Sequence, residues 1–187
     1  MKTPTTFLEE RKYQVIYADP PWNYSAGAKK NGFSSSAYPP MKTEAICALN
    51  IAGIIDENAH LYLWTTNFFL PDAIRVLESW GFRYVTMLTW YKGNGGMGRY
   101  FQTNTEHVLF GVKGSLKTKT LKSNYFDFKN PRKHSKKPDE FRDMIVERSG
   151  NLPRIELFAR TKTNGWDVWG NEVKSDITLP PHSQYEM

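Results

Sequence analysis

Cysteine is nearly absent from this sequence: Cys47 is the only one among 187 residues. A single cysteine excludes an intramolecular disulfide and a zinc site built from several cysteines. The four histidines, at positions 60, 107, 134 and 182, show no spacing typical of metal ligands, so each is expected to be a surface or core residue. We therefore predict no metal cofactor.

Long hydrophobic runs are absent as well. None approaches the roughly 18 residues of a membrane span, and the opening residues, Met-Lys-Thr-Pro, lack the apolar core of a signal peptide. These absences predict a cytoplasmic protein that has no membrane partner.

The residues that are present describe a folded, basic protein. Hydrophobic residues make up 40% of the chain and aromatic residues 14%, which excludes a disordered protein. The length favours a single domain over residues 1–187, with a core at about 13–173. The formal net charge of +6 favours a polyanionic partner, although charge alone does not identify nucleic acid.

The tetrapeptide Asp19-Pro20-Pro21-Trp22 follows the run 13–18, whose β-branched and aromatic residues predict a buried strand. Two successive prolines have no backbone N–H to donate, so they end the strand. Open α/β sheets bind their ligands beyond the carboxyl ends of the strands. We therefore take these four residues as the centre of a candidate active site.

The chemistry of this tetrapeptide predicts recognition of an exocyclic amine. Pro21 biases Pro20 towards an extended conformation, so the Asp19 carboxylate and the Pro20 carbonyl become two fixed acceptors. Two acceptors suit the amino group of adenine or cytosine, and they direct its nitrogen lone pair towards an electrophile. Trp22 offers a ring on which a flipped base can stack. The alternative is an Asp-Pro turn followed by a core tryptophan.

Strands and helices alternate along the rest of the chain. Further strands are predicted at 61–65, 84–90, 107–112 and 154–159, with helices at 67–80 and 138–150 and a short helix capped by Thr43. This alternation predicts an α/β fold, a mostly parallel sheet with helices on both faces. Segments 23–40 and 91–100 are predicted loops, and we interpret the second, which is rich in glycine, as a mobile substrate gate rather than a plain hairpin connection.

The basic segment 114–137 interleaves lysines and arginines with Tyr125, Phe126 and Phe128. A run of charge is usually a solvated face, but aromatic residues among the lysines favour contacts with single-stranded nucleic acid or a flipped base. From this segment and the two loops we predict the following substrate contacts: Tyr24, Lys92, Arg99, Lys133 and Lys136.

The last long strand indicates a cofactor site. Glu156 is an acid within an otherwise apolar run, and Arg160, Asn164 and Asn171 follow the carboxyl end of that run. Ribose hydroxyls and an amino-acid carboxylate need such donors and acceptors. An Arg–Glu pair with loop-capping amides fits these residues equally well when they are considered alone.

Five motifs occur in order along the chain: Asp19-Pro20-Pro21-Trp22, Glu106-His107, Lys137-Pro138-Asp139-Glu140, Glu156-Leu157-Phe158-Ala159-Arg160, and Gly165-Trp166 through Gly170-Asn171-Glu172. Together they resemble the S-adenosylmethionine-dependent adenine methyltransferases of the MT-A70 family, over about residues 13–173.

This resemblance implies a Rossmann-like class I methyltransferase fold with a permuted motif order, and S-adenosylmethionine as the cofactor. It implies that Asp19 and Pro20 orient the adenine amino group and that Trp22 stacks on the base. Glu106 and Trp90 match positions close to the acceptor. The implied cofactor pocket, to which we add Asp19 and Glu156, is lined by Lys137, Arg160, Asn164, Asn171 and Glu172.

The predicted reaction is direct methyl transfer to the N6 amino group of adenine in nucleic acid. We predict DNA as the acceptor, because a small catalytic domain without accessory modules resembles the bacterial and phage members of the family. Three alternatives remain: an RNA adenosine methyltransferase, a cytosine-N4 DNA methyltransferase, and a non-catalytic nucleic-acid-binding subunit. The eukaryotic relatives pair as heterodimers, which suggests a homodimer here.

Overall fold

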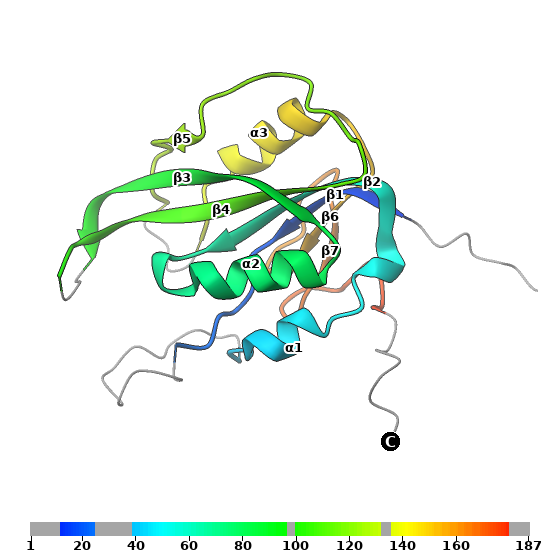
Figure 1. Ribbon diagram of the computed structural model, residues 1–187, viewed down its shortest axis with the longest axis horizontal. Coiled ribbons are helices and arrows are strands. Elements are labelled where there is room, and N and C mark those ends of the chain that lie inside the picture. Colours follow the sequence, from blue (N-terminus) through cyan, green and yellow to red (C-terminus); the bar gives the residue numbers. More distant parts are fainter. Residues whose placement is uncertain (1–11, 25–38, 97–99, 132–135, 180–187) are drawn as a thin grey trace, which may run out of the picture.

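A computed structural model of the chain describes residues 12–24, 39–96, 100–131 and 136–179 (Figure 1). Within these residues, seven strands form one sheet in the order β5-β3-β4-β2-β1-β6-β7. β4 runs antiparallel to β2 and β3, and the other neighbouring pairs of the sheet are parallel. The mostly parallel sheet predicted from the sequence is therefore confirmed. The strands are β1 Tyr13–Ala18, β2 Ile55–Thr65, β3 Arg83–Gly96, β4 Thr103–Lys113, β5 Tyr125–Phe126, β6 Arg154–Leu157 and β7 Asp167–Trp169.

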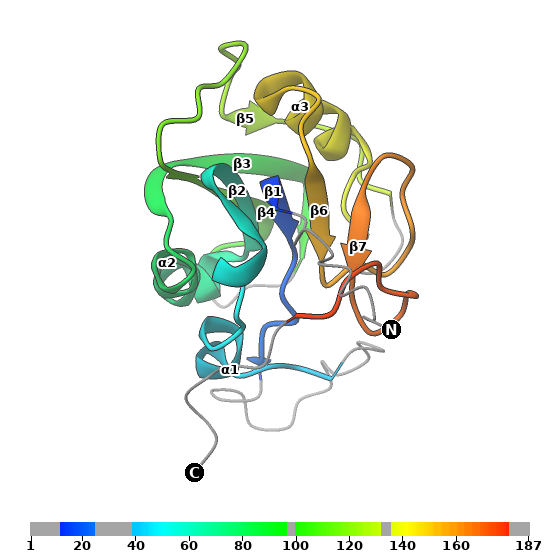
Figure 2. The same cartoon turned by 90° about the vertical axis from the view of Figure 1, so that its right-hand side faces the viewer.

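Helices cover both faces of this sheet (Figures 1 and 2). One face packs α1 and α2 against a layer that includes Ile16 and Leu61. The other face packs α3 against a layer that includes Tyr17 and Trp64. Ile16 and Tyr17 belong to different layers because successive strand residues point to opposite faces. The helices are α1 Thr43–Cys47, α2 Leu70–Ser79 and α3 Glu140–Ser149, with 3-10 turns η2 Ala52–Ile54 and η3 Asn67–Phe69.

The sequence of α2 explains where this helix begins and ends. Pro71 lies in the first turn, where its missing N–H would be unpaired in any case, and Asp72 there is favoured by the helix dipole. Gly81, with φ +82°, follows the end of the helix in a conformation that suits glycine. The helix predicted at 67–80 thus exists, although its first three residues form η3. The side chains that α2 buries are Ala73, Val76 and Leu77.

The predicted cap of the short helix is wrong. Thr43 is the first residue of α1, and Lys42 precedes it as the N-cap without a side-chain hydrogen bond. The helix forms nonetheless, because it buries Ile46 against α2, where the carbonyl oxygen of Ile46 accepts a 3.0 Å hydrogen bond from Trp80 Nε1.

β3 and β4 form a long hairpin that corrects a further expectation. The strand predicted at 84–90 continues to Gly96, with Tyr91 opposite Thr105 and Gly96 opposite Thr103. Residues 91–96 are therefore strand and not loop, because cross-strand pairing outweighs the weak strand propensity of glycine. In Figure 1 this end of the hairpin extends beyond the rest of the sheet. The substrate gate stays a prediction, and residues 97–99 lie outside the described part of the chain.

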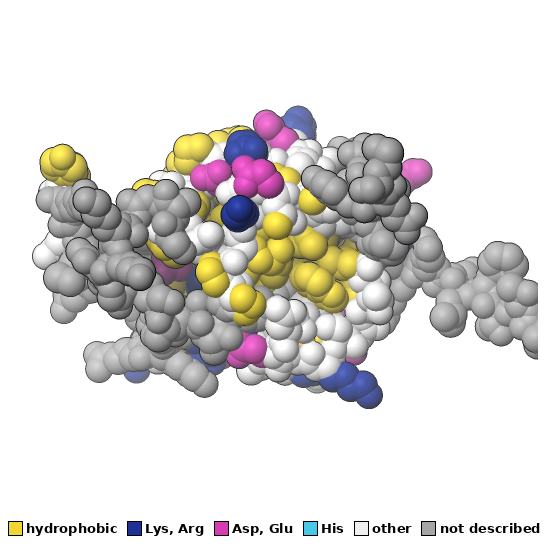
Figure 3. All heavy atoms as spheres, turned by 90° about the horizontal axis from the view of Figure 1, so that it is seen from below, with side chains coloured by type: hydrophobic (Ala, Val, Ile, Leu, Met, Phe, Trp, Pro, Cys, Tyr) yellow, Lys and Arg dark blue, Asp and Glu magenta, His cyan; other side chains and the backbone are white. Residues whose placement is uncertain are grey.

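The layer formed by α1 and α2 is not fully covered. Met41, Leu49 and Ile74 pack against it but are only partly buried. Seen from below, on the side of α1, the molecule presents a central group of hydrophobic side chains with charged side chains around it (Figure 3). In the described residues, no helix is both long enough and apolar enough to cross a membrane.

Candidate active site

Asp19 directly follows β1, an interior strand of the sheet, at the carboxyl edge of the parallel part. Ala18, the last residue of β1, pairs with Leu63 of β2 on one side and with Leu157 of β6 on the other. The ends of three parallel strands therefore meet around Asp19, whose side chain is 33% exposed. The sequence predicts this acid at the carboxyl end of a strand, and the structure confirms that position; ligand binding there stays a prediction.

The backbone of the tetrapeptide is tied to its surroundings. The Pro20 carbonyl accepts a 2.9 Å hydrogen bond from the Trp22 N–H, and the Pro21 carbonyl accepts a 2.8 Å bond from the Met41 N–H. A carbonyl oxygen has two lone pairs, so Pro20 can accept a second hydrogen bond. The turn is thus held on both sides, as its two prolines predict.

Trp22 is a buried residue, with 7% of its surface exposed. Its Nε1 donates a 3.1 Å hydrogen bond to the Trp64 carbonyl, and its ring stacks on Phe69 with centroids 5.4 Å apart and planes 16° apart. One face of the indole is therefore used within the protein. Stacking of a flipped base on Trp22 stays a prediction.

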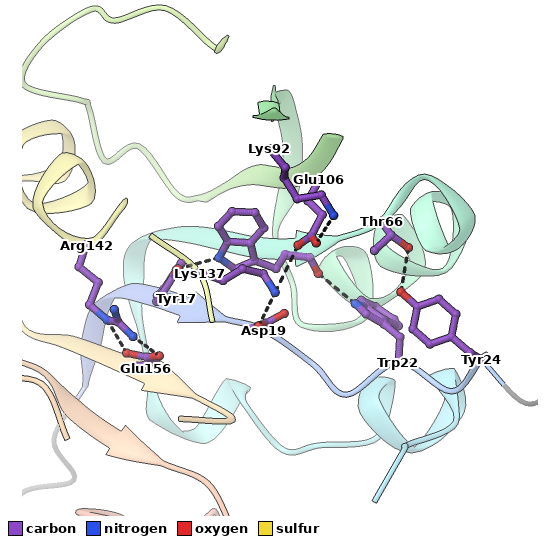
Figure 4. A network of polar contacts seen from close by, with 11 residues as sticks. Tyr17, Asp19, Trp22, Tyr24, Thr66, Lys92, Glu106, Lys137, Arg142 and Glu156 are labelled. Carbon is purple, nitrogen blue, oxygen red and sulfur yellow. Dashed lines mark hydrogen bonds and ion pairs between the residues drawn. The ribbon is translucent and has the colours of Figure 1, made fainter. Parts of the chain in front are cut away.

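Three charged side chains, from β3, β4 and the segment before α3, meet beside Asp19 and form a cluster of four with it (Figure 4). Lys137 Nζ, just before α3, lies 2.8 Å from Asp19 Oδ2 and 3.3 Å from Glu106 Oε2. Lys92 Nζ on β3 lies 2.9 Å from Glu106 Oε1 on β4. The cluster alternates two cations with two anions, so its formal charges cancel. None of the described residues forms a hydrogen bond with Asp19 Oδ1.

Burial and neighbouring charges set the protonation of this cluster. Burial raises the pKa of Asp19, and the charge of Lys137 opposes that effect without cancelling it. Burial also disfavours the charged form of Glu106, but Lys137 and Lys92 outweigh it and lower the pKa of Glu106. Burial works against the charge on Lys137, yet Asp19 and Glu106 raise its pKa overall. The cluster therefore shifts the pKa values of its two carboxyl groups in opposite directions.

The Lys137 side chain packs on the Trp64 ring, which further aromatic side chains hold in place. Its ammonium lies 5.1 Å from the centroid of the Trp64 ring, within the range of a cation–π contact. Trp64 Nε1 in turn donates a 2.7 Å hydrogen bond to the Tyr17 hydroxyl, and the edge of the Phe141 ring packs on Trp64. These contacts fix Lys137 against the core.

Glu156 takes part in the Arg–Glu pair that the sequence allowed, but with Arg142 of α3 as its partner. Arg142 Nε and Nη2 each lie 2.8 Å from one oxygen of Glu156, and the guanidinium also lies over the Tyr17 ring. Arg160 pairs instead with Glu172, at 3.0 Å. Contact of Glu156 with a cofactor stays a prediction.

The segment after β6 has an unusual backbone. Phe158 has φ +61°, which is uncommon for a residue other than glycine and often marks functional sites. The Ala159 N–H donates to the Trp169 carbonyl, and a Cβ at Gly170 would collide with the backbone of Ala159. This close approach holds the segments carrying Arg160 and Glu172 together. The predicted cofactor residues Asn164 and Asn171 are both exposed. Asn164 precedes Gly165, whose carbonyl accepts a hydrogen bond from Arg154 at the start of β6, so Asn164 lies at the amino end of this strand and away from Arg160.

The remaining predicted substrate contacts differ in their positions. Tyr24 is 49% exposed, and its hydroxyl is 3.3 Å from Thr66 Oγ1. Lys136 pairs with Asp139 at the start of α3. Trp90 is a core residue, 2% exposed, so the prediction that it contacts substrate is not supported: its side chain packs on Trp64 and Phe141. Arg99 and Lys133 lie outside the described residues.

Sequence reasoning missed several side chains around Asp19. Thr66, Asn67 and Phe68 follow β2, the parallel neighbour of β1, so the rule that ligands bind at carboxyl ends could have identified them. Asn67 Oδ1 is bonded to His107 Nε2. Burial lowers the pKa of His107. Among the described residues, no group of histidine, cysteine and acidic side chains could hold a metal ion.

The sheet, its helices and the carboxyl-edge acid define a Rossmann-like methyltransferase fold. The model of the MT-A70 family matches residues 13–172. A Mycoplasma protein named "Type II methyltransferase M.MunI" is 35% identical over 200 residues, covering 96% of this chain and 86% of that protein. This chain belongs to the MT-A70 family, which confirms the resemblance seen in its motifs.

Plant and animal relatives match a smaller share of their own length. A putative N(6)-adenosine-methyltransferase MT-A70-like protein of Medicago truncatula is 30% identical over 172 residues, covering 87% of this chain and 26% of that protein. The human N(6)-adenosine-methyltransferase catalytic subunit METTL3 is 28% identical over 182 residues, covering 91% of this chain and 30% of that protein. The chain thus corresponds to about a quarter to a third of these two proteins.

Proposed function

We propose that this protein transfers a methyl group from S-adenosylmethionine to the N6 amino group of adenine in DNA. The observation that carries the proposal is the Asp19 side chain at the end of β1: Lys137 binds one carboxylate oxygen, and the Pro20 carbonyl is next to it in the chain. Membership of the MT-A70 family and the names of the relatives support the same reaction.

Asp19 and Pro20 act on the two hydrogens of the amine. One N–H of adenine donates to Asp19 Oδ1, and the other donates to the Pro20 carbonyl, which keeps its bond from Trp22. With both hydrogens held on one side, the nitrogen lone pair points to the other side. Positioning of this kind can supply most of the rate enhancement of a direct transfer.

Asp19 also receives the proton that must leave. Methylation replaces one N–H bond of adenine with an N–C bond, and the bond from the methyl carbon to the sulfonium sulfur would break at the same time. The nitrogen therefore releases one proton, and the cofactor would leave as the neutral thioether S-adenosylhomocysteine. Burial raises the pKa of Asp19, which makes its carboxylate a better acceptor than an ordinary aspartate. Lys137 keeps Asp19 ionised before the reaction, and the proton then passes to solvent.

The chain offers suitable partners for S-adenosylmethionine, which supplies an activated methyl group on a positively charged sulfur. Arg160, 43% exposed in its pair with Glu172, can bind the amino-acid carboxylate. Glu172 can accept hydrogen bonds from the ribose hydroxyls or the ammonium group. Asn171, next to Glu172 beyond the end of β7, adds an exposed amide, whereas Asn164 lies at the other end of β6 and is not included. The donor and acceptor set therefore fits the cofactor.

DNA is proposed as the acceptor because M.MunI, the relative that this chain matches over 86% of its length, is named a type II methyltransferase. The formal charge of +6 suits any nucleic acid and does not separate DNA from RNA. We further propose that two copies of the chain associate, with the partly covered hydrophobic face beside α1 as a candidate contact.

Methyl transfer from labelled S-adenosylmethionine to matched DNA and RNA, followed by nucleoside analysis, tests the proposal. We expect N6-methyladenine from DNA, and a loss of about 10²–10⁴-fold in rate for Asp19→Asn. Glu78→Gln, an exposed acid on α2, is the matched control and should leave the rate unchanged. Methylcytosine as the product, or transfer to RNA alone, would replace the proposed substrate. Cofactor binding without any transfer would favour a binding subunit.

A further inference from the structure

We propose that Phe68, supported by Tyr24, stacks on the nucleobase next to the target adenine. This inference rests on the proposed function and adds a substrate-binding residue that the motifs do not contain. Phe68 lies in η3, directly after β2, and 66% of its surface is exposed. A large apolar ring this exposed gains little from packing within the protein.

Phe68 belongs to a preassembled group of rings. The Tyr24 ring lies nearly parallel to it, with centroids 6.4 Å apart and planes 29° apart. Both rings are nearly perpendicular to the Phe69 ring, whose centroid is 4.9 Å from that of Phe68 and 4.8 Å from that of Tyr24. Phe69 is 5% exposed and anchors the group in the core. Two exposed rings held in this way lose little freedom when a ligand stacks on them.

The group of rings is in direct contact with the catalytic tetrapeptide through Trp22. Phe69 carries Trp22 stacked on it, and Trp22 follows Asp19 by three residues. Tyr24 is close enough to Asp19, Glu106 and Lys137 for their charges to act on its hydroxyl. Figure 4 shows Tyr24 beside Trp22, on the β2 side of Asp19. A base that stacks here would lie beside the adenine whose amino group reaches Asp19.

The exposed rings of Phe68 and Tyr24 suit a nucleobase as their ligand. An adenine that leaves the helix to reach Asp19 removes a stacking partner from its neighbours. An aromatic side chain can replace that partner, which stabilises the complex whatever the identity of the base.

The test measures kcat/KM on a short DNA duplex that contains one adenine mapped as methylated in the activity assay. Three duplexes are compared: the intact one, one with an abasic nucleotide on the 5′ side of the adenine, and one with it on the 3′ side. Each is assayed with the parent protein, Phe68→Ala and Phe68→Trp. Tyr84→Ala is the matched control. Tyr84 is an aromatic residue that is 41% exposed, and it lies at the start of β3, whereas Lys92 of the site lies towards the end of this strand.

We expect Phe68→Ala to lower kcat/KM on intact DNA by about 5- to 150-fold, the equivalent of about 1–3 kcal/mol per stacked base. For the parent protein, one of the two abasic duplexes should lower kcat/KM by a similar factor relative to intact DNA. For Phe68→Ala, the same abasic duplex should lower kcat/KM little further, because the stacking contact is already lost. Phe68→Trp should restore the sensitivity, and Tyr84→Ala should behave as the parent does. Affinity for S-adenosylmethionine, measured by calorimetry, should be unchanged in all variants.

The inference is overturned if the loss caused by the abasic nucleotide and the loss caused by Phe68→Ala are independent of each other. If the parent methylates adenine but the abasic penalty is the same in Phe68→Ala, then Phe68 does not contact that base, while the proposed function stands. If the parent methylates no adenine in any nucleic acid, both proposals fail together. A loss of cofactor affinity in Phe68→Ala would show a structural role and would also overturn the inference.

Discussion

Replacing Arg142 by leucine should destabilise the protein strongly. The guanidinium donates two 2.8 Å bonds to the two oxygens of Glu156, and the two side chains are only 12% and 10% exposed. Leucine would leave the Glu156 carboxylate in the same place without its cation. Breaking a buried pair on one side costs about 3–5 kcal/mol. For a chain of this size, that loss lowers Tm by about 6–20 °C.

The assay is urea and thermal unfolding, followed by circular dichroism, of Arg142→Leu, Glu156→Leu and the double variant. The double variant should regain most of the loss, because replacing both partners of a buried pair by apolar groups is often close to neutral. Arg75→Leu is the matched control. Its pairs with Glu44 and Asp72, at 3.7 and 3.6 Å, are largely exposed, so we expect a change below about 1 kcal/mol.

Small and additive losses would refute this reasoning. If each single variant costs less than about 1 kcal/mol and the double variant costs their sum, the pair is not coupled in the way its geometry implies. The same variants separate the two interpretations of Glu156. A folded double variant that still binds S-adenosylmethionine would make Glu156 a structural residue, whereas a folded variant without affinity would make it a cofactor contact.

Three further predictions concern residues around the candidate active site: Lys137, Glu106 and Gly170. Lys137→Met should move the acid limb of the pH–rate profile to higher pH, because it removes the cation that opposes the burial-raised pKa of Asp19; an unmoved limb would contradict this. The folded-state pKa of Glu106 is lowered, so its pairing stabilises the protein above the unfolded-state pKa and is lost as the pH falls through the folded one. Glu106→Gln should therefore be less stable than the parent at neutral pH and approach it in acid, as urea unfolding at both pH values can check; an equal difference at both would speak against the argument. Gly170→Ala should lower the unfolding free energy by about 1–3 kcal/mol, because its Cβ would meet the backbone of Ala159, and an unchanged Tm would show that the segment yields.

The position of Asp19 was predictable because its causes are local. A buried run of β-branched and aromatic residues makes the strand, and Pro20 and Pro21 end it, without any contact from elsewhere. The alternation of strands with helices likewise predicted the mostly parallel sheet. Periodicity within α2 and its terminal Gly81 gave that helix to within a few residues.

The contacts around Asp19 were not predictable in the same way, because they join distant positions. Lys137 is 118 residues from Asp19 in the sequence, and nothing near either residue indicates that they pair. The sequence allows an Arg–Glu pair for Glu156, but the arginine that the structure pairs with it, Arg142, lies on a different element, α3. Trp90, which the resemblance places close to the acceptor, is a core residue, because the packing of α3 covers its side chain.

The interior position of β1 also has a kinetic consequence. Arg160 and Glu172 lie on the side of β6 and β7, whereas Glu106 and Phe68 lie on the side of β4 and β2. On the proposed function, the cofactor would bind on the flank of β6 and β7 and the adenine on the flank of β4 and β2, and direct transfer across Asp19 requires both ligands together. Initial-rate plots should then show the intersecting lines of a ternary complex. A single molecule that spans both flanks should bind more tightly than either half, because its second contact forms at a high effective concentration.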